Sequence, residues 1–171
     1  MNELSIISKY LKSLSLKNPG ALKLNDDIYF DAKNSTVISV DTFVEGIHFI
    51  NSSDPSNFLK KILRASLSDL YCKGVKPKTY FLSLALNKQL ATVAWLNKVK
   101  KILNNEQKKF NISLAGGDTT QSSKLVITHS SELGNFKLLN PSIKYLKPFR
   151  TKSLPTVRTI NLSLCIFLGK K

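Results

Sequence analysis

The sequence predicts an α+β fold, in which helices and strands alternate over roughly residues 1–130. Apolar residues recur at helical spacing in three segments, and apolar runs of strand length lie between them. Clusters of glycine, proline, asparagine and aspartate separate many of these segments. The chain has 171 residues, of which 42% are hydrophobic, so it is long enough to bury one sizeable core.

Three segments show the spacing of amphipathic helices. Residues 2–15 form the first. The second follows the loop 52–57 and ends near Gly74 and Pro77, because these residue types typically follow the end of a helix. The third covers residues 89–103. The apolar face of the second helix is formed by Leu59, Ile62, Leu63, Leu67 and Leu70.

Four segments within residues 1–130 are predicted as strands, and in the remainder only residues 161–168 look like one. The run 79–86 (TYFLSLAL) is apolar enough for a buried strand, and residues 36–41 form a strand that ends in an aspartate. Residues 112–120 (ISLAGGDTT) are predicted as a strand that runs into a glycine turn, and residues 124–128 form the fourth strand.

Residues 131–171 lack this patterning. They contain eight lysine or arginine residues and one acid, Glu132, with prolines at 141, 148 and 155. We expect one amino-terminal domain over residues 1–130, followed by an atypical basic tail with no second domain. Two interpretations of the tail are open: a loosely folded extension, or the product of a frameshifted or truncated reading frame.

The formal net charge of +15, from 26 basic and 11 acidic residues, suggests an anionic partner such as a nucleic acid, a membrane surface or a phosphorylated small molecule. Scattered lysines usually only solvate a surface, however. The sequence has no long run of basic residues and no aromatic RNA-binding signature. Nucleic-acid binding therefore rests on net charge alone.

The sequence also lacks the features of membrane and secreted proteins. No window holds the run of about 18 apolar residues that a membrane span needs. Glu3, Ser5 and Ser8 interrupt any apolar run at the start, so we expect no signal peptide. Cys72 and Cys165 form neither a disulfide framework nor a zinc motif, so a cytoplasmic location is expected.

The few acidic residues stand out at four places, Asp26–Asp27, Asp41, Asp69 and Asp118. Each is predicted at the end of a helix or strand, where a turn can present it to a shared cleft. Taken alone, Asp41 fits a turn-initiating or helix-capping aspartate. Asp69 lies in the last turns of a helix, where the macrodipole disfavours an anion by about 0.3–1 kcal/mol. Either a cation lies near Asp69 or the residue is simply exposed.

Carboxylates that converge on a phosphate make chemical sense with Mg²⁺ between them. Mg²⁺ prefers oxygen ligands, and such ions neutralise ATP and the charge of a transferring phosphoryl group. The glycines of AGGD (115–118) can expose backbone N–H groups to an anion. This short motif is weak by itself, and neither the P-loop nor the G-x-G-x-x-G motif occurs. The grouped acids are therefore expected to hold Mg²⁺ beside a phosphate.

In order and spacing, these pieces resemble thiamine-monophosphate kinase, of the superfamily of aminoimidazole ribonucleotide synthetase and selenophosphate synthetase. The resemblance covers about residues 3–130, which is the amino-terminal domain of that family. The D-T-x-V-E-G-x-H-F pattern is the most diagnostic part. The matching stretches are NDD (25–27), VISVDTFVEGIHF (37–49), SLSDLYCKGVKP (66–77) and LAGGDTT (114–120).

The resemblance implies a mixed sheet with helices on one face, and catalysis by positioning and metal binding without a catalytic side chain. It assigns Gly117 and Asp118 to ATP, and His48 to the thiamine phosphate. His48 lies beside Phe49, so a packed aromatic is the simpler alternative for it. The implied Mg²⁺ ligands are Asp27, Ser39, Val40, Asp41, Asp69 and Asp118.

Four positions depart from the family's usual pattern. Val40 stands where threonine is common; the change is mild if the family's contact is a main-chain carbonyl, and removes a ligand if it is the hydroxyl. Asn25 replaces a usual glycine, which stiffens the loop. Cys72–Lys73 replaces alanine-methionine, which we interpret as a change compatible with an exposed surface.

By this resemblance, the leading prediction is an ATP- and Mg²⁺-dependent kinase that converts thiamine monophosphate to thiamine diphosphate by in-line transfer. The family implies a homodimer whose amino-terminal sheets pair, and we expect the chain without a second domain to be inactive or nearly so. Two alternatives are a related ATP-dependent synthetase, and a non-catalytic basic protein that binds nucleotide or nucleic acid. The D-T-F-V-E-G-I-H-F stretch argues against the first, and the grouped acids argue against the second.

Overall fold

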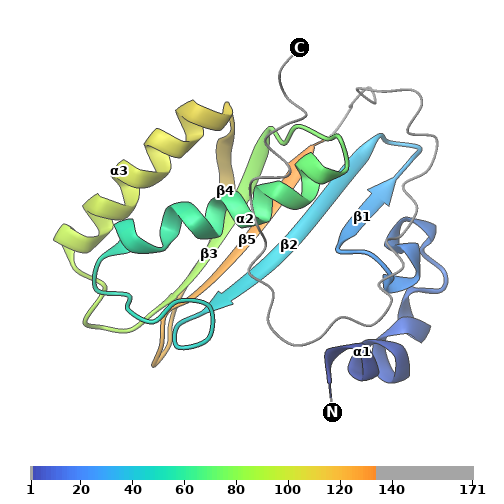
Figure 1. Ribbon diagram of the computed structural model, residues 1–171, viewed down its shortest axis with the longest axis horizontal. Coiled ribbons are helices and arrows are strands. Elements are labelled where there is room, and N and C mark those ends of the chain that lie inside the picture. The colour runs from blue at the N-terminus through green and yellow to red at the C-terminus, as the bar shows by residue number, and fades with distance from the viewer. Residues whose placement is uncertain (1, 134–171) are drawn as a thin grey trace.

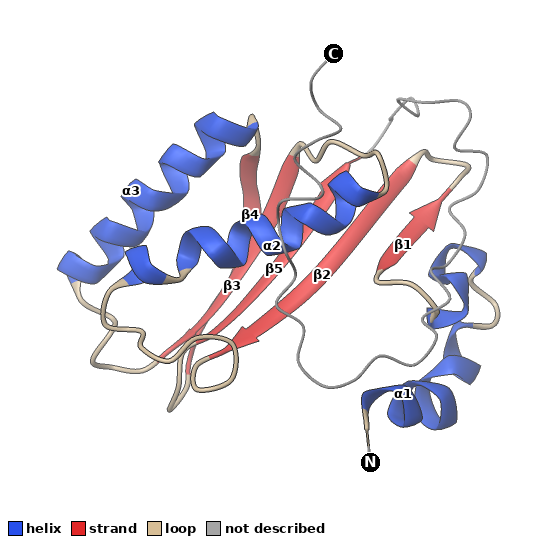
Figure 2. Ribbon diagram, in the orientation of Figure 1, coloured by secondary structure: helices blue, strands red, loops and turns tan. Residues whose placement is uncertain are grey.

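A five-stranded mixed sheet with two long helices on one face forms the body of the protein (Figures 1 and 2). The computed structural model describes residues 2–133. The strand order is β1-β2-β5-β3-β4, and β3 and β4 are parallel while the other neighbouring pairs are antiparallel. This confirms the predicted fold class. The strands are β1 Ile28–Asp31, β2 Thr36–Val44, β3 Thr79–Leu86, β4 Ser113–Gln121 and β5 Val126–Leu133.

The two long helices are α2, Leu59–Cys72, and α3, Val93–Phe110. All five predicted apolar positions of α2 are buried, so the helical spacing correctly identified its core face. The third helix was predicted too early, at residues 89–103. It begins after Thr92, whose side chain accepts a hydrogen bond from the backbone N–H of Trp95, and it ends at Asn111 in the left-handed conformation.

The two faces of the sheet differ in what covers them. Side chains that alternate toward α2 and α3 are buried, as at Val37 and Ser39 on β2 and Tyr80 on β3. Their neighbours point the other way, and Val40 and Phe81 are 59% and 40% exposed. Within residues 2–133, the helices therefore leave one face of the sheet open.

The amino-terminal segment contradicts the predicted single helix over residues 2–15. It forms the α-helical turn α1, Glu3–Ile6, the π turn η1, Ile7–Leu11, and the 3-10 turn η2, Lys12–Ser15. Most of its apolar side chains are exposed, with Leu4 at 73% and Leu14 at 79%. Because a short helix depends on packing of its apolar face, this segment lacks, among residues 2–133, the packing that would keep it regular.

Two further 3-10 segments complete the described chain, η3 at Pro19–Leu24 and η4 at Pro55–Asn57. No helix within residues 2–133 is long and apolar enough to cross a membrane. The predicted basic tail lies outside the described residues, except that its first three residues extend β5.

Candidate functional site

Asp41 and Asp118 both lie inside strands, although the sequence placed them at strand ends. β2 continues to Val44, because its last residues pair with the start of β5. β4 continues through Gly117 and Asp118 to Gln121, so the predicted glycine turn is wrong. Gly117 lies close against β3, where a Cβ atom would overlap the Leu82 carbonyl oxygen. The glycine is thus needed for strand pairing.

The carboxylates of Asp27, Asp41 and Asp69 lie near one another at the end of α2. Burial raises the pKa of Asp69 to about 6, with further contributions from Asp41 and Asp27. Burial also raises the pKa of Asp41, the Ser66 hydroxyl opposes this shift, and Asp27 adds to it. The three residues come from the loop before β1, from β2 and from α2. We call these three residues the acidic cluster.

Two buried serines accompany the acidic cluster. Ser39 lies two residues before Asp41 on the same face of β2, and Ser66 lies on α2, which packs over β2. The Ser39 hydroxyl is buried without a hydrogen-bond partner within the described residues, and the Ser66 hydroxyl and Asp41 Oδ2, although they interact, do not reach hydrogen-bond geometry with each other or with another described group. Unpartnered buried oxygens of this kind indicate a position for water or an ion. Val40 points to the open face, so its side chain lies outside the cluster.

Asp26 has a different role from its neighbour Asp27. Its Oδ1 accepts a hydrogen bond from the backbone N–H of Asp27 at 2.9 Å, and its Oδ2 accepts one from Lys73 Nζ at 2.6 Å. The Lys73 side chain is only 16% exposed and that of Asp26 only 4%. The interpretation of Lys73 as a surface-compatible change is therefore wrong. Sequence reasoning missed this pair because its two members are 47 residues apart.

Gly117 and Asp118 do not join the acidic cluster. The strand register places Asp41, His129, Leu82 and Gly117 in one row across β2, β5, β3 and β4. Three strand spacings therefore separate Asp41 from Gly117, a distance of about 14 Å. Asp118 is exposed and stands in the next row.

His48 lies in the loop that follows β2. Its Nδ1 accepts a hydrogen bond from the backbone N–H of Val44 at 2.9 Å, and its ring meets Phe43 edge-on. In a neutral ring the proton is therefore on Nε2, which can donate to a ligand. The side chain is exposed, so His48 is not buried within the core.

A cavity of about 500 Å³ lies beside His48. Aromatic rings form much of its wall, and Phe49 and Phe58 stack with ring centroids 4.4 Å apart. Asn51, Asn57 and Lys61 supply polar groups to the same cavity. Such a site suits a ligand with flat rings and at least one polar or anionic group.

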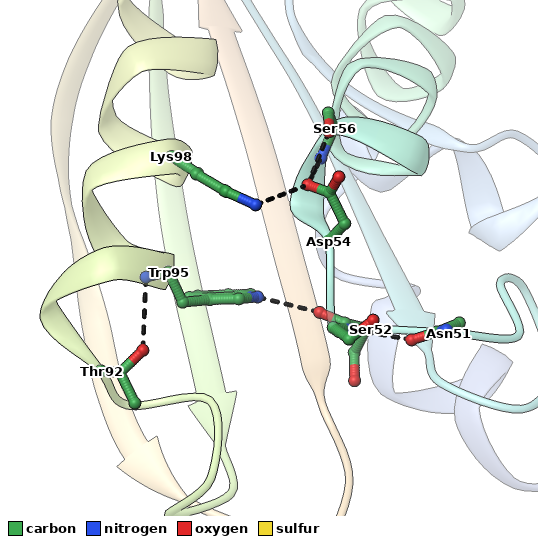
Figure 3. A network of polar contacts seen from close by, with 8 residues as sticks. Asn51, Ser52, Asp54, Ser56, Thr92, Trp95 and Lys98 are labelled. Atoms are coloured by element: carbon green, nitrogen blue, oxygen red, sulfur yellow. Dashed lines mark hydrogen bonds and ion pairs between the residues drawn. The ribbon is translucent and has the colours of Figure 1, made fainter.

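Glu45, in the most diagnostic stretch of the sequence, stabilises the loop that carries His48. Its Oε1 accepts hydrogen bonds from the backbone N–H and the hydroxyl of Ser52, at 3.2 and 2.5 Å. Its Oε2 accepts one from the backbone N–H of Leu125 at 3.1 Å. Figure 3 shows the same loop held from α3, where Trp95 Nε1 donates to the Ser52 carbonyl at 2.8 Å. Both carboxylate oxygens of Glu45 therefore accept hydrogen bonds from the protein itself.

Within residues 2–133, no three histidine, cysteine or acidic side chains are arranged to hold a metal ion by themselves. The acidic cluster is instead an incomplete set of oxygen ligands, with one buried carboxylate oxygen lacking a partner. Mg²⁺ commonly keeps waters and takes phosphate oxygens in addition to one or two carboxylates. The residues present fit that kind of site.

The sequence profile of a protein family described as "AIR synthase related protein, N-terminal domain" matches residues 20–131. The chain belongs to this family. The matched range contains the acidic cluster, the His48 loop and all five strands except the last two residues of β5. For an AIR synthase related domain, the mixed sheet with helices on one face is the expected architecture, as the solved structures below show.

Curated relatives of this AIR synthase related chain are named thiamine-monophosphate kinase. The protein of Buchnera aphidicola subsp. Acyrthosiphon pisum (strain APS) is 37% identical over 153 residues, which cover 85% of this chain and 44% of the relative. The protein of Escherichia coli (strain K12) is 33% identical over 123 residues, which cover 70% and 37%. The chain therefore spans less than half the length of these relatives.

Two solved structures share the fold. Thiamine monophosphate kinase from Aquifex aeolicus has a TM-score of 0.67 and 22% identity, covering 80% of this chain and 43% of that one. A structure described as "AaThiL complexed with AMPPCP and TMP" has a TM-score of 0.65 and 23% identity, covering 77% and 41%. At these identities the comparison establishes the fold alone.

Proposed function

We propose that this chain is the metal- and phosphate-binding part of a thiamine-monophosphate kinase, which transfers the γ-phosphoryl group of ATP to thiamine monophosphate. The observation that carries the proposal is the gathering of Asp27, Asp41 and Asp69 in a domain whose curated relatives bear that name. The activity of the whole protein, its substrates and its domain organisation, with residues 1–130 as the ATP- and Mg²⁺-binding domain, belong to this proposal.

In this proposal Asp27, Asp41 and Asp69 bind Mg²⁺, with Ser39 beside them. Burial and mutual repulsion raise the pKa of Asp41 and Asp69, so a divalent cation would relieve an unfavourable charge distribution. Bound Mg²⁺ would neutralise the phosphate charge during transfer. The side chains would hold the reacting phosphates in line and need not form a covalent intermediate.

Gly117 and Asp118 contact ATP in the proposed complex. Because about 14 Å separates their strand from Asp41, no single ion can join Asp118 to the acidic cluster within one chain. Asp118 would therefore act on a separate metal ion or on the nucleotide. Any role of Val40 would use its main chain, since its side chain points to the open face.

His48 and the aromatic cavity beside it bind thiamine monophosphate. The substrate has two flat rings and a phosphate, which match the aromatic walls of the cavity and its polar groups. The backbone of Val44 fixes Nδ1 of His48 as an acceptor, so Nε2–H is the group that would donate to the substrate. Lys61 places a positive charge at the same cavity.

A homodimer across the open face of the sheet also belongs to the proposal. Val40 and Phe81 are exposed apolar side chains on this face, and a second copy would bury such surface. We also propose the cytoplasm as its location. Neither a nucleic acid nor a membrane is a proposed partner.

The proposal is tested by calorimetric titration of the full chain with thiamine monophosphate and, separately, with thiamine. The monophosphate is expected to bind and thiamine to bind more weakly, because only the monophosphate carries phosphate oxygens that can accept a hydrogen bond from His48. The His48→Ala variant should lose this preference, whereas the Lys98→Ala variant, which changes an exposed lysine outside the cavity, should keep it. Equal binding of both ligands would contradict the proposed substrate site.

A further inference from the structure

Lys73 is a largely buried cation beside the acidic cluster. Its ammonium group lies 2.6 Å from Asp26 Oδ2, and both side chains are largely shielded from water. An ion pair in such a place is far less screened than one on the surface. The other described lysine ion pair, between Lys98 and Asp54, is longer at 3.7 Å and exposed.

Lys73 also faces the cluster from the helix side. It follows the last residue of α2 and lies four residues after Asp69, the spacing that places two side chains on one helix face. Its charge lowers the pKa of Asp69, against the effects of burial, Asp41 and Asp27. The helix dipole favours the positive charge of Lys73 at the C-terminal end of α2 and disfavours the negative charge of Asp69 there. Lys73 therefore pairs with Asp26 and also acts electrostatically on Asp69.

The contacts continue from Lys73 through Asp26 to the backbone of Asp27. Asp26 binds the ammonium group with one carboxylate oxygen and the N–H of Asp27 with the other. Asp27 is itself exposed and interacts electrostatically with Asp41 and Asp69. These contacts connect Lys73 to the backbone that carries the Asp27 carboxylate.

We propose that Lys73 is a positioning residue for the metal site: through Asp26 it holds the loop of residues 25–27 against the end of α2, and so directs Asp27 toward Asp41 and Asp69. The proposal rests on the proposed function for the presence of a metal ion. It assigns Asp26 to the scaffold and Asp27 to the ligands. The cation at the end of α2, Lys73, thus stabilises the position of this loop.

An apolar contact next to the loop offers a competing explanation. Ile28 is buried with Val37, Leu70 and Val75, and this small core could hold the loop without Lys73. The two explanations differ in what loss of the ammonium group does. If the apolar core suffices, the loop stays in place in the Lys73→Met variant; if Lys73 positions it, the loop is released.

The first experiment needs no metal. Hydrogen exchange of the amides of residues 25–28 is measured in the metal-free full chain, in Lys73→Met and in Lys98→Met, which removes the same charge elsewhere. We expect exchange in Lys73→Met to be faster by about tenfold or more, and Lys98→Met to resemble the parent chain. Unchanged exchange in Lys73→Met would overturn the inference.

The second experiment measures Mn²⁺ affinity by electron paramagnetic resonance, with the ATP analogue AMPPCP present. Loss of a residue that orients a metal ligand typically weakens metal binding about 10–100-fold, and we expect this in Lys73→Met. Removing a positive charge would by itself strengthen Mn²⁺ binding, so the sign separates positioning from simple charge repulsion. Equal or tighter binding in Lys73→Met would overturn the inference.

Two further variants keep the test informative if Lys73→Met leaves Asp26 as an unpaired buried charge and fails to fold. Lys73→Arg retains the cation and is expected to retain both Mn²⁺ affinity and slow exchange. The double variant Asp26→Asn with Lys73→Met removes both charges. It is expected to bind Mn²⁺ more weakly and to exchange the loop amides faster than the parent chain. If the parent chain binds no Mn²⁺, the proposed function fails, while the exchange experiment still decides whether Lys73 holds the loop.

Discussion

Asp41 and His129 stand directly opposite each other on β2 and β5, and both side chains lie on the face of the sheet that α2 covers. His129 is 1% exposed, its ring stacks on Tyr80 with centroids 5.1 Å apart, and its Nδ1 lies 3.3 Å from Ser131 Oγ. Burial lowers the pKa of His129 to about 4. At neutral pH the neighbour of Asp41 on β5 is therefore uncharged, and it does not compensate the charge of the acidic cluster.

His129 predicts a loss of stability in mild acid. Its pKa rises from about 4 in the folded chain to 6.5 in the unfolded chain, so the unfolded state binds more protons in this range and stability falls as the pH drops from 6.5 toward 4. The effect approaches about 3 kcal/mol, since one pKa unit corresponds to about 1.4 kcal/mol. His129→Phe, which keeps a ring against Tyr80, should show a smaller loss in urea unfolding at pH 7 and pH 4.5. An identical loss would contradict the assignment.

Asp69 predicts the opposite trend. Its folded pKa of about 6 lies above the ordinary value of 3.8, so the folded state binds more protons between these values and stability falls as the pH rises through this range. In metal-free buffer at pH 7.5, Asp69→Asn should therefore be more stable than the parent chain, by at most about 3 kcal/mol. Denaturant unfolding at pH 7.5 and pH 5 measures this. A variant that is less stable at pH 7.5 would show that the carboxylate has a partner that compensates its charge.

We predict that Glu45, which lies in the most diagnostic motif, stabilises the loop that carries His48. Hydrogen bonds to charged groups contribute about 1.5–3 kcal/mol, so Glu45→Gln should destabilise the chain by an amount in this range at neutral pH, while Glu3→Gln, an exposed acid, should have little effect. Hydrogen bonds from Ser52 hold the pKa of Glu45 below 4.5, so this contribution is present above that pH and is lost as the pH falls through the lowered value. Equal stability of both variants at pH 7 would contradict the role.

The open sheet face predicts a dimer that a single charge disrupts. Phe81→Glu places a carboxylate on the exposed face of β3 and should shift the chain to monomers in sedimentation velocity experiments at micromolar concentration. Leu96→Glu makes the same kind of change at an exposed apolar position on α3 and should leave the dimer intact. If the parent chain is already a monomer, or both variants behave alike, the proposed interface is wrong.

Local patterns in the sequence predicted the central elements well. The bounds of β3 match the predicted run 79–86, because a continuous apolar run between a proline and a polar loop has few alternatives. The buried face of α2 follows from helical spacing. Of the acidic positions singled out in the sequence, Asp27, Asp41 and Asp69 lie near one another in the fold, whereas Asp118 does not.

Other features depend on contacts between distant residues and could not be read locally. β2 extends past Asp41 because residues 126–128 offer backbone partners, and β4 extends through its glycines because β3 accepts them in register. The buried position of Lys73 depends on Asp26, far away in the sequence. The amino-terminal segment shows helical spacing but lacks a surface to pack against within the described residues.

The most direct test of the central claim is calorimetric titration of the full chain with AMPPCP, in Mg²⁺ and in EDTA, for the parent chain, Asp41→Asn and Asp54→Asn. Asp54 caps η4 and is exposed, so its variant matches the charge change away from the cluster. We predict Mg²⁺-dependent binding that is retained in Asp54→Asn and weakened about tenfold or more in Asp41→Asn, as expected for loss of a metal ligand. Binding in EDTA as tight as in Mg²⁺, or equal Mg²⁺-dependent affinity in both variants, would contradict the claim that the acidic cluster holds the metal-bound nucleotide.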